Sequence, residues 1–311
     1  MTRTIERINY LYTYSWDEGE HSLCQLEMRS LFGFDTESTL LESTLRIDPS
    51  RSPFMKERID ILYRCNSLEE LVQNVKDLRV NTTFKVLFVK NGEKVSFNER
   101  RSIERKIGLE IQGTVDLVNP QAMFGIIKVK EGWIFGQYFK SEPIWLHHQK
   151  KPRNYSTALG TRVARAVVNI AVPQTHNIKA IDPCCGIGTV LIEALSMNID
   201  IVGSDINPLA AIGARENLSY FGLEGDVILK DIRNVIGRYD VAIIDMPYNH
   251  CSVLEPEMQL EMLQSARKFA TKVVIITVET IDVLLDTAGF EIIARCIAQK
   301  GQFTRQVIVC Q

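Results

Sequence analysis

Hydrophobic residues in the second half of the chain alternate between two spacings. Short runs rich in Val and Ile are typical of strands buried on both faces, and between them apolar residues recur at helical spacing. The runs that predict strands are Lys179–Ile181, Ile199–Ile206, Val227–Leu229, Tyr239–Ile244 and Lys272–Val278. The stretches that predict helices are Val190–Met197, Pro208–Phe221, Pro256–Ala270 and Ile281–Ala288. Two final runs, Phe290–Ala298 and Gln306–Val309, predict an antiparallel hairpin that completes a Rossmann-like, doubly wound α/β sheet of seven strands.

The first half has the mixed pattern of an α+β region. Its predicted strands are Tyr10–Tyr14, Thr83–Val89, Met123–Lys130 and Trp133–Phe139. Its predicted helices are His21–Leu31, a helix opened by a capping box of Ser67 and Glu70 and running to Leu78, and Asn98–Ile107, which is expected to stop at Gly108. A polar stretch with Asp48-Pro49 and Pro53 predicts a loop or a subdomain boundary. We therefore expect an N-terminal α+β subdomain at 1–66, a second α+β domain at 67–140, a linker at 141–155 and the doubly wound domain at 156–311.

Composition narrows the class of protein. A chain of 311 residues, 45% of them hydrophobic, suits two globular domains, and no apolar run approaches the length of a membrane span. The seven cysteines include no C-x-x-C pair, and His147-His148 has no partner at ligand spacing, so we expect neither a disulfide framework nor a metal site. The first residues lack the apolar core of a signal peptide. These features predict a soluble, cytoplasmic protein with no membrane partner.

Charge is distributed unevenly although the net charge is only −2. Residues 94–165 carry 13 Lys and Arg against 6 Asp and Glu, a net charge of +7. Residues 1–93 carry 12 against 15, and residues 166–311 carry 11 against 17, so both flanks are acidic. A basic stretch between acidic ends is typical of a localised polyanion-binding face, and a solvated charged surface is the alternative.

The segment Asp182–Thr189 follows a predicted strand and opens a predicted helix. Glycines in such a loop let the backbone approach a ligand, and the helix N-terminus offers free N–H groups. Asp205, nineteen residues after Gly186, ends the next strand, where a carboxylate can accept hydrogen bonds from ribose hydroxyls. The third glycine of the dinucleotide fingerprint is missing, so S-adenosylmethionine fits better than a pyrophosphate cofactor. The alternative is a tight strand–helix turn beside a coincidental acid.

A second segment, Asp245-Met246-Pro247-Tyr248, ends the fourth predicted strand and faces the same crevice. The exocyclic amine of a base is a poor nucleophile because its lone pair is delocalised into the ring. Asp245 and the Met246 carbonyl can each accept one N–H and so localise that lone pair. Pro247 fixes the backbone, and Tyr248 offers a ring on which a flipped base can stack. The segment therefore predicts methyl transfer to an exocyclic amine.

Two roles fit Asp231, which ends the third predicted strand. It can accept a hydrogen bond from the adenine amine of the cofactor, or it can cap a helical segment that begins at Arg233. The adjacent Cys184 and Cys185 are expected to be small buried residues rather than nucleophiles or metal ligands. The predicted cofactor-binding residues are Asp182, Cys185, Gly186, Gly188, Thr189, Asp205, Ile206, Asp231 and Ile232.

These motifs resemble those of the THUMP-domain RNA methyltransferases, which modify N2 of guanosine in tRNA. The run from Asp182 to Ala194 resembles that family's cofactor loop, Ala164–Asn169 resembles the segment before its catalytic core, and Asp245–Tyr248 matches its catalytic tetrapeptide. Arg101–Gly108 followed by Val115–Pro120 resembles its THUMP module, an RNA-binding domain. The resemblance covers residues 70–311, and residues 1–70 correspond to the subdomain that packs with THUMP.

The resemblance implies a Rossmann-like methyltransferase domain preceded by a THUMP-type region, with S-adenosylmethionine as cofactor and tRNA as partner. The basic residues placed on RNA phosphates are Arg100, Arg101, Arg105, Lys106, Lys128, Lys130, Lys150, Lys151 and Arg153. The chain departs from the family at Met246, where many members have proline, and at Asn249, where glycine is common. Both departures bear on which base is methylated more than on the reaction.

We therefore predict an S-adenosylmethionine-dependent methyltransferase that acts on guanosine N2 in tRNA. Adenine N6 and a protein glutamine amide are alternative acceptors for the same pocket. Two alternatives come from other classes: a non-catalytic RNA-binding protein with a degenerate cofactor site, and a nicotinamide-dependent oxidoreductase. The intact Asp205 and Asp245 oppose the first, and the missing third glycine opposes the second. A small partner subunit, used by some family members, is left open.

Overall fold

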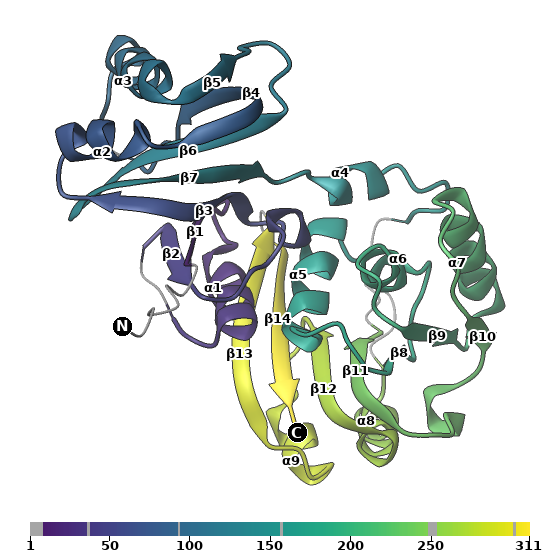
Figure 1. The fold of residues 1–311 in the computed structure, drawn as a ribbon. Helices are drawn as coiled ribbons and strands as arrows, with labels where there is room; N and C mark the ends of the chain where they lie inside the picture. Colours follow the sequence, from purple (N-terminus) through teal and green to yellow (C-terminus); the bar gives the residue numbers. More distant parts are fainter. Residues whose placement is uncertain (1–8, 36–37, 93, 156–157, 248–253, 301–302) are drawn as a thin grey trace, which may run out of the picture. The chain divides into compact units, whose positions relative to one another are not determined.

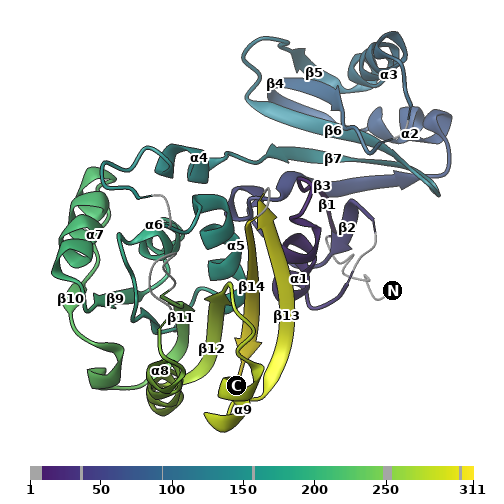
Figure 2. The same cartoon turned by 180° about the vertical axis from the view of Figure 1, so that it is seen from behind.

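The computed structural model describes residues 9–35, 38–92, 94–155, 158–247, 254–300 and 303–311. These residues form two compact units (Figures 1 and 2). The first unit contains the described residues of segments 1–15 and 36–142, and the second unit contains those of segments 16–35 and 143–311. The chain therefore contributes one short early segment to the second unit before it completes the first.

The second unit is built around a seven-stranded sheet in the order β10-β9-β8-β11-β12-β14-β13. Its strands are β8 (Ala180–Asp182), β9 (Ile201–Asp205), β10 (Val227–Leu229), β11 (Tyr239–Asp245), β12 (Ala270–Thr277), β13 (Ile292–Lys300) and β14 (Phe303–Cys310). The strands from β10 to β12 run parallel, and β14 is antiparallel to both β12 and β13. The predicted doubly wound sheet with a closing hairpin is confirmed.

Helices cover both faces of this sheet. They are α1 (His21–Phe32), α4 (Ile144–His148), α5 (Thr161–Ala171), α6 (Thr189–Leu195), α7 (Pro208–Tyr220), α8 (Pro256–Phe269) and α9 (Asp282–Thr287), with a 3-10 turn η2 at Ile232–Asn234. On one face α5 and α6 pack against each other, and α8 and α9 pack together on the other (Figures 1 and 2). The early helix α1 lies against α5 and β13. The core of the α8 face contains Ile244, Leu263 and Ile275.

Capping signals explain where several of these helices begin. Asn207 accepts a hydrogen bond from the N–H of Leu209, and Pro208 occupies the first turn of α7, as the sequence predicts. The helix α5 was not predicted, because it follows Gly160 and has no side-chain cap. The helix α4 falls inside the segment that we expected to be a linker.

The first unit is also a seven-stranded sheet, in the order β2-β1-β3-β7-β6-β4-β5. Its strands are β1 (Tyr10–Tyr14), β2 (Leu40–Ser43), β3 (Met55–Cys65), β4 (Arg79–Phe88), β5 (Gln112–Val115), β6 (Ala122–Val129) and β7 (Gly132–Lys140). Its helices are α2 (Leu68–Val75) and α3 (Phe97–Glu110), with a 3-10 turn η1 at Pro49–Arg51. The strand β4 runs parallel to both β5 and β6, and α3 connects β4 to β5. A buried cluster that includes Leu71, Phe84, Ile107, Phe124 and Phe135 joins α2 and α3 to the sheet.

The first unit departs from the sequence prediction in several elements. The strand β3 was not predicted, because charged residues interrupt its pattern, yet Arg58 is buried there and pairs with Asp60 at 2.6 Å. The strand β5 is exposed at every position and therefore has no hydrophobic pattern to detect. The helix α3 continues through Gly108 instead of stopping there.

Ser67 caps α2 as predicted, since its hydroxyl accepts the N–H of Glu70 at 3.1 Å. The Glu70 carboxylate accepts the N–H of Asn66 rather than that of Ser67, and the helix ends at Val75 rather than Leu78.

The division of the chain differs from the expected one. Strands from both expected N-terminal segments, 1–66 and 67–140, share the sheet of the first unit, so their boundary does not separate compact units. The helix α1 and the described residues from 143 onward of the expected linker, 141–155, belong to the second unit. Sequence patterns locate elements, but the pairing of strands distant in the chain decides which elements share a core.

Candidate functional site

Three aspartates end neighbouring strands of the second unit. Asp205, Asp182 and Asp245 are the last residues of β9, β8 and β11, which are consecutive in the sheet. The strand order reverses between β8 and β11, and ligands of open α/β sheets bind outside the carboxyl ends of the strands at such a point. The three carboxylates therefore lie where the topology predicts a binding site.

The loop after β8 has the close backbone approach that its glycines predict. Gly186 and Gly188 have φ angles of 54° and 79°, in the left-handed region that favours glycine. A Cβ atom on Gly186 would lie 2.7 Å from the hydroxyl oxygen of Tyr155, and one on Gly188 would lie 3.2 Å from the Cβ of Ala214. Side chains at these two positions would therefore disturb the path of the loop, and Gly188 is the N-cap of α6.

Asp205 holds this loop in place. One of its carboxylate oxygens accepts the N–H of Gly186 at 2.8 Å, and the other accepts the N–H of Asn207 at 2.8 Å. Each carboxylate oxygen has a further lone pair, so Asp205 can still accept a hydrogen bond from a ribose hydroxyl. Asp205 thus lies at the glycine loop, and its contact with a ribose hydroxyl stays a prediction.

Several predicted cofactor residues have buried side chains. Asp182 is 2% exposed and accepts the N–H of Cys184 at 3.2 Å, and burial raises its pKa well above the usual value, with Asp245 and Asp205 adding to the effect. Cys185, Thr189 and Ile232 are also buried, whereas Ile206 is 65% exposed. Contact of a cofactor with any of these side chains stays a prediction. Only Ile206 of this group has an exposed side chain.

Both cysteines of the loop are poor nucleophiles. Burial raises the pKa of Cys184 and of Cys185, and the nearby aspartates raise both further. Since only the thiolate is reactive, these thiols are inert at neutral pH. Cys185 packs against Gly203, where an added Cβ would lie 3.2 Å from its sulfur.

Asp231 caps the 3-10 turn η2, which is the second of the two roles considered for it. Its carboxylate accepts the N–H of Arg233 at 2.8 Å and pairs with the guanidinium of the same residue at 2.7 Å. The hydrogen bonds from Arg233 lower the pKa of Asp231. A contact with the adenine of a cofactor remains a prediction for this residue.

Asp245 has the most unusual environment of the three aspartates. Its Oδ1 atom is buried and has no hydrogen-bond partner in the described part of the chain. Burial raises the pKa of Asp245 to about 7, and the positive charge of Arg305 opposes this rise. A buried, unpartnered acceptor costs free energy, so such an atom at a topological switch point indicates a place where a ligand donates a hydrogen bond.

The rest of the predicted tetrapeptide is only partly described. The Met246 side chain is 4% exposed, and its N–H donates to the carbonyl of Ile276 at 2.9 Å, which leaves the Met246 carbonyl unused by the hydrogen bonds of the described residues. Pro247 is exposed. Tyr248 and Asn249 lie outside the described residues, so the predicted stacking ring is not placed.

Two residues near the site were missed by sequence reasoning. Tyr155 reaches the glycine loop from the segment expected to be a linker, and Arg305 acts on Asp245 from the last strand. A lone tyrosine or arginine carries no sequence signal, because only the fold brings it to the site.

The predicted basic residues fall in both units. Arg101, Arg105, Lys106, Lys128, Lys130, Lys150 and Arg153 are exposed, and Arg100 is half-buried. Some are already paired: Arg101 with Glu104 at 2.7 Å, Lys106 with Glu69 at 3.6 Å and Arg153 with Glu216. Lys130 lies in the turn after β6, not on the strand face it was expected to share with Lys128.

Lys151 corrects the prediction of a phosphate contact. It is 7% exposed, and burial lowers the pKa of its ammonium group, with Glu193 opposing. The neighbouring His148 is also buried rather than solvent-exposed, with its Nδ1 atom 2.8 Å from Glu193. A phosphate would have to displace the protein around Lys151 to reach it.

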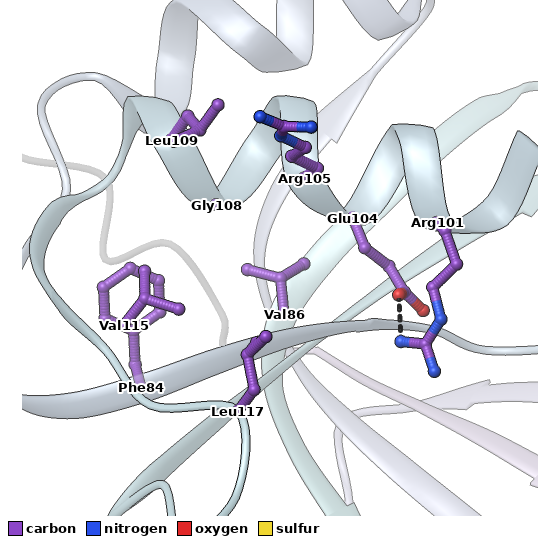
Figure 3. Close-up of a pocket in the computed structure, with 9 residues that line it drawn as sticks. All are labelled: Phe84, Val86, Arg101, Glu104, Arg105, Gly108, Leu109, Val115 and Leu117. Atoms are coloured by element: carbon purple, nitrogen blue, oxygen red, sulfur yellow. Dashed lines mark hydrogen bonds and ion pairs between the residues drawn. The ribbon is translucent and has the colours of Figure 1, made fainter. Parts of the chain in front are cut away.

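A groove of about 290 Å³ lies within the first unit, beside α3 (Figure 3). Apolar residues from β4, β5 and the following loop form its floor, and Arg101, Glu104 and Arg105 of α3 lie along it. Its lining consists of Phe84, Val86, Arg101, Glu104, Arg105, Gly108, Leu109, Val115 and Leu117. Leu109 and Leu117 are 72% and 65% exposed, which is unusual for large apolar side chains.

Two further features concern ligands and membranes. Among the described residues, no group of three or more His, Cys, Asp or Glu side chains is arranged to hold a metal ion. In the same part of the chain, no helix has both the length and the apolar character that crossing a membrane requires.

Comparison with known proteins agrees with the geometry of the second unit. Residues 148–288 match the family UPF0020, described as an RMKL-like methyltransferase domain. This range contains the glycine loop, the three aspartates and the helices α5 to α9. The predicted methyltransferase fold is therefore confirmed.

Similar proteins carry related names. A protein from Methanothermobacter thermautotrophicus, named tRNA (guanine(10)-N2)-dimethyltransferase, is 29% identical over 161 residues, which are 48% of this chain and 48% of that protein. A Mycobacterium tuberculosis protein, named an uncharacterized S-adenosylmethionine-dependent methyltransferase, is 38% identical over 64 residues, 21% of this chain and 18% of that protein. The chain thus aligns with about half the length of the first of these relatives.

Among solved structures, TrmN from Thermus thermophilus covers 97% of this chain and 99% of its own, with a TM-score of 0.49 and 17% identity.

Proposed function

We propose that this chain is an S-adenosylmethionine-dependent RNA methyltransferase that methylates an exocyclic amine of a base, guanosine N2 in tRNA. The observation that carries the proposal is the buried, unpartnered oxygen of Asp245 beside the glycine loop of a methyltransferase domain. An exocyclic amine is the donor that such an acceptor requires. The printed names of the relatives, a tRNA guanine-N2 dimethyltransferase and an S-adenosylmethionine-dependent methyltransferase, support the choice of acceptor and cofactor.

The residues at the carboxyl edge fit the cofactor. At Gly186 and Gly188 a Cβ atom would crowd Tyr155 and Ala214, so the glycines let the loop keep its tight path beside the methionine end of the cofactor. Asp205 can accept from the ribose, and the exposed Ile206 can pack against the adenine. Asp231 is assigned to the adenine amine, which its remaining lone pairs can accept.

When bound, S-adenosylmethionine supplies an electrophilic methyl group on a sulfonium sulfur. Asp245 and the Met246 carbonyl each accept one N–H of the target amine, and this localises the nitrogen lone pair and aims it at the methyl carbon. Transfer of the methyl group would leave the amine nitrogen positively charged, with S-adenosylhomocysteine as the leaving group. Asp245 then takes the surplus proton, because a carboxylate with a pKa near 7 is a competent base at neutral pH.

RNA is the proposed substrate because the basic stretch lies in the first unit and in the segment before α5. Arg101 and Arg105 project from α3 along a groove with an apolar floor, a combination that suits an unpaired base and its phosphate. A target base inside a helix would have to be flipped out, or be offered by a loop or junction. We infer a cytoplasmic location from the tRNA substrate.

The test is methyl transfer from labelled S-adenosylmethionine to unmodified tRNA, followed by nucleoside analysis. Label in N2-methylguanosine is the expected result. Label in N6-methyladenosine would show that adenine N6 is the acceptor. Label only in protein would indicate a glutamine amide as the acceptor. Absence of cofactor binding by calorimetry would overturn the enzyme assignment in favour of a non-catalytic RNA-binding protein.

A further inference from the structure

The hairpin of β13 and β14 extends beyond the carboxyl edge of the parallel sheet (Figure 1). The last residue of β12, Thr277, pairs with Gln306 of β14. Residues 303–305 of β14 pair only with β13, in the register Ala298–Arg305 to Lys300–Phe303. This end of the hairpin therefore rises past the strand ends that carry the site.

Strand register places Arg305 and Asp245 on the same face of the sheet. In the strand register Asp245 pairs with Ile276, and Ile276 pairs with Val307, so these three residues lie side by side in one row across β11, β12 and β14. Their neighbours Ile244, Ile275 and Ile308 all belong to the core under α8, so the row faces the other side, where α5 lies. Arg305, two residues before Val307, faces that side too.

The distances make Arg305 a neighbour of the site. Its Cα lies about 7 Å beyond the row along β14 and about 10 Å across from β11, by ordinary strand spacing. A long arginine side chain spans much of that distance. In agreement, the charge of Arg305 acts on the Asp245 carboxyl.

The guanidinium of Arg305 is held in a defined place. Its central carbon lies 4.4 Å from the centroid of the Phe303 ring, which is two residues away on the same face. Cation–π contact of this kind orients a planar guanidinium. Phe303 is thus a positioning residue for Arg305.

We propose that Arg305 binds the phosphodiester next to the target nucleotide while the base amine lies on Asp245. This inference rests on the proposed function and names the residue that orients the substrate within the site. A nucleotide inserted between the two carries its amine on the base edge and its negative charge on the backbone. This face of the sheet carries the Asp245 carboxylate for the base amine and the Arg305 guanidinium for the phosphodiester. Guanidinium groups bind phosphate with matched geometry.

The test compares the wild-type protein with Arg305→Gln in tRNA binding at several salt concentrations. Loss of one phosphate contact should weaken binding and reduce the slope of log Kd against log salt by about 0.7 to 0.9. Binding of S-adenosylhomocysteine should not change, Arg305→Lys should recover part of the RNA affinity, and Phe303→Leu should lose part of it.

Arg295→Gln is the matched control, because Arg295 is level with Ile308 on the opposite face of the same hairpin and pairs with Asp282 and Gln306. It should leave the salt slope unchanged. An Arg305→Gln variant with wild-type affinity and slope would overturn the proposal, even if its turnover fell, since Arg305 would then act on Asp245 alone. Failure of the proposed function would differ, because the wild-type protein itself would neither bind nor methylate tRNA.

Discussion

At the scale of single residues, the central feature is the buried carboxylate of Asp245. Asp245 ends a strand whose preceding residues, Ala242, Ile243 and Ile244, are fully buried, so its charge is poorly solvated. The sequence places Asp245 at the carboxyl edge of the sheet, because an acid after a buried strand lies there, and its contact with the amine stays a prediction. The sequence could not predict the raised pKa, which depends on burial by neighbours distant in the chain.

The pH dependence of methyl transfer follows from that pKa. Burial raises the pKa of Asp245 to about 7, so the carboxylate needed by the amine is lost as the pH falls through 7. We expect kcat/KM for tRNA to fall tenfold per pH unit on the acid side and to level off above pH 8. An acid limb centred near pH 4, the ordinary carboxyl range, would contradict the burial argument.

Gly186 provides a second test at this scale. In Gly186→Ala the new Cβ would be strained by the left-handed backbone and would lie 2.7 Å from the Tyr155 hydroxyl. We expect at least a tenfold weaker Kd for S-adenosylhomocysteine in calorimetry. Gly222→Ala is the matched control, since its φ is 64° and nothing lies within 4 Å of the added atom. Equal effects of the two variants would show that backbone strain alone is responsible.

At the scale of elements, a buried ionic network joins α4 and α5, which precede β8, to α6, which follows the glycine loop. Glu193 of α6 is fully buried and lies 2.8 Å from Nδ1 of His148 in α4 and 2.9 Å from Nη1 of Arg165 in α5. The sequence analysis did not predict α4, which falls in the expected linker, or α5, which has no side-chain cap. The burial of His148 and Arg165 is explained by their shared partner Glu193, which is distant in the chain.

Glu193→Gln tests this network. The amide keeps the size of the side chain but leaves Arg165 without its buried counter-charge, and breaking such a pair costs about 3–5 kcal/mol. Glu216→Gln is the control, because Glu216 pairs with Arg153 at the surface, where a pair contributes about 0–1 kcal/mol. Urea denaturation measures both free energies of unfolding. Similar losses for the two variants would contradict a special role for the buried network.

At the scale of the whole molecule, the division into units was the part least accessible to sequence. The order and type of most elements in the second unit follow from local patterns, since its strands are short, apolar and separated by capped helices. That α1 belongs to the second unit does not follow from local patterns. It depends on long-range contacts such as the hydrogen bond that Asn169 of α5 donates to Glu27 of α1, 2.6 Å long and across 142 positions of the chain. Long-range contacts of this kind leave no local signal.

The position of α1 predicts how fragments behave. A fragment of residues 143–311 lacks α1, whose Leu23, Leu26, Met28 and Leu31 are buried. Burial of each such side chain contributes about 1.5–3 kcal/mol, so their loss approaches the whole stability of a domain. We expect this fragment to aggregate or to melt at much lower temperature than the full chain, and a fusion that restores residues 16–35 to recover it. A fragment as stable as the full chain would contradict the division described above.

The central claim is that Asp245 and the glycine loop form one methyl-transfer site for a base amine in RNA. The most direct measurement is single-turnover methyl transfer to unmodified tRNA by the wild-type protein and Asp245→Asn, with bound S-adenosylmethionine quantified in each sample. We predict label in N2-methylguanosine, a rate about 10²- to 10⁴-fold lower in the variant, and equal cofactor occupancy. Equal rates for the two proteins, with the cofactor bound in both, would contradict the account.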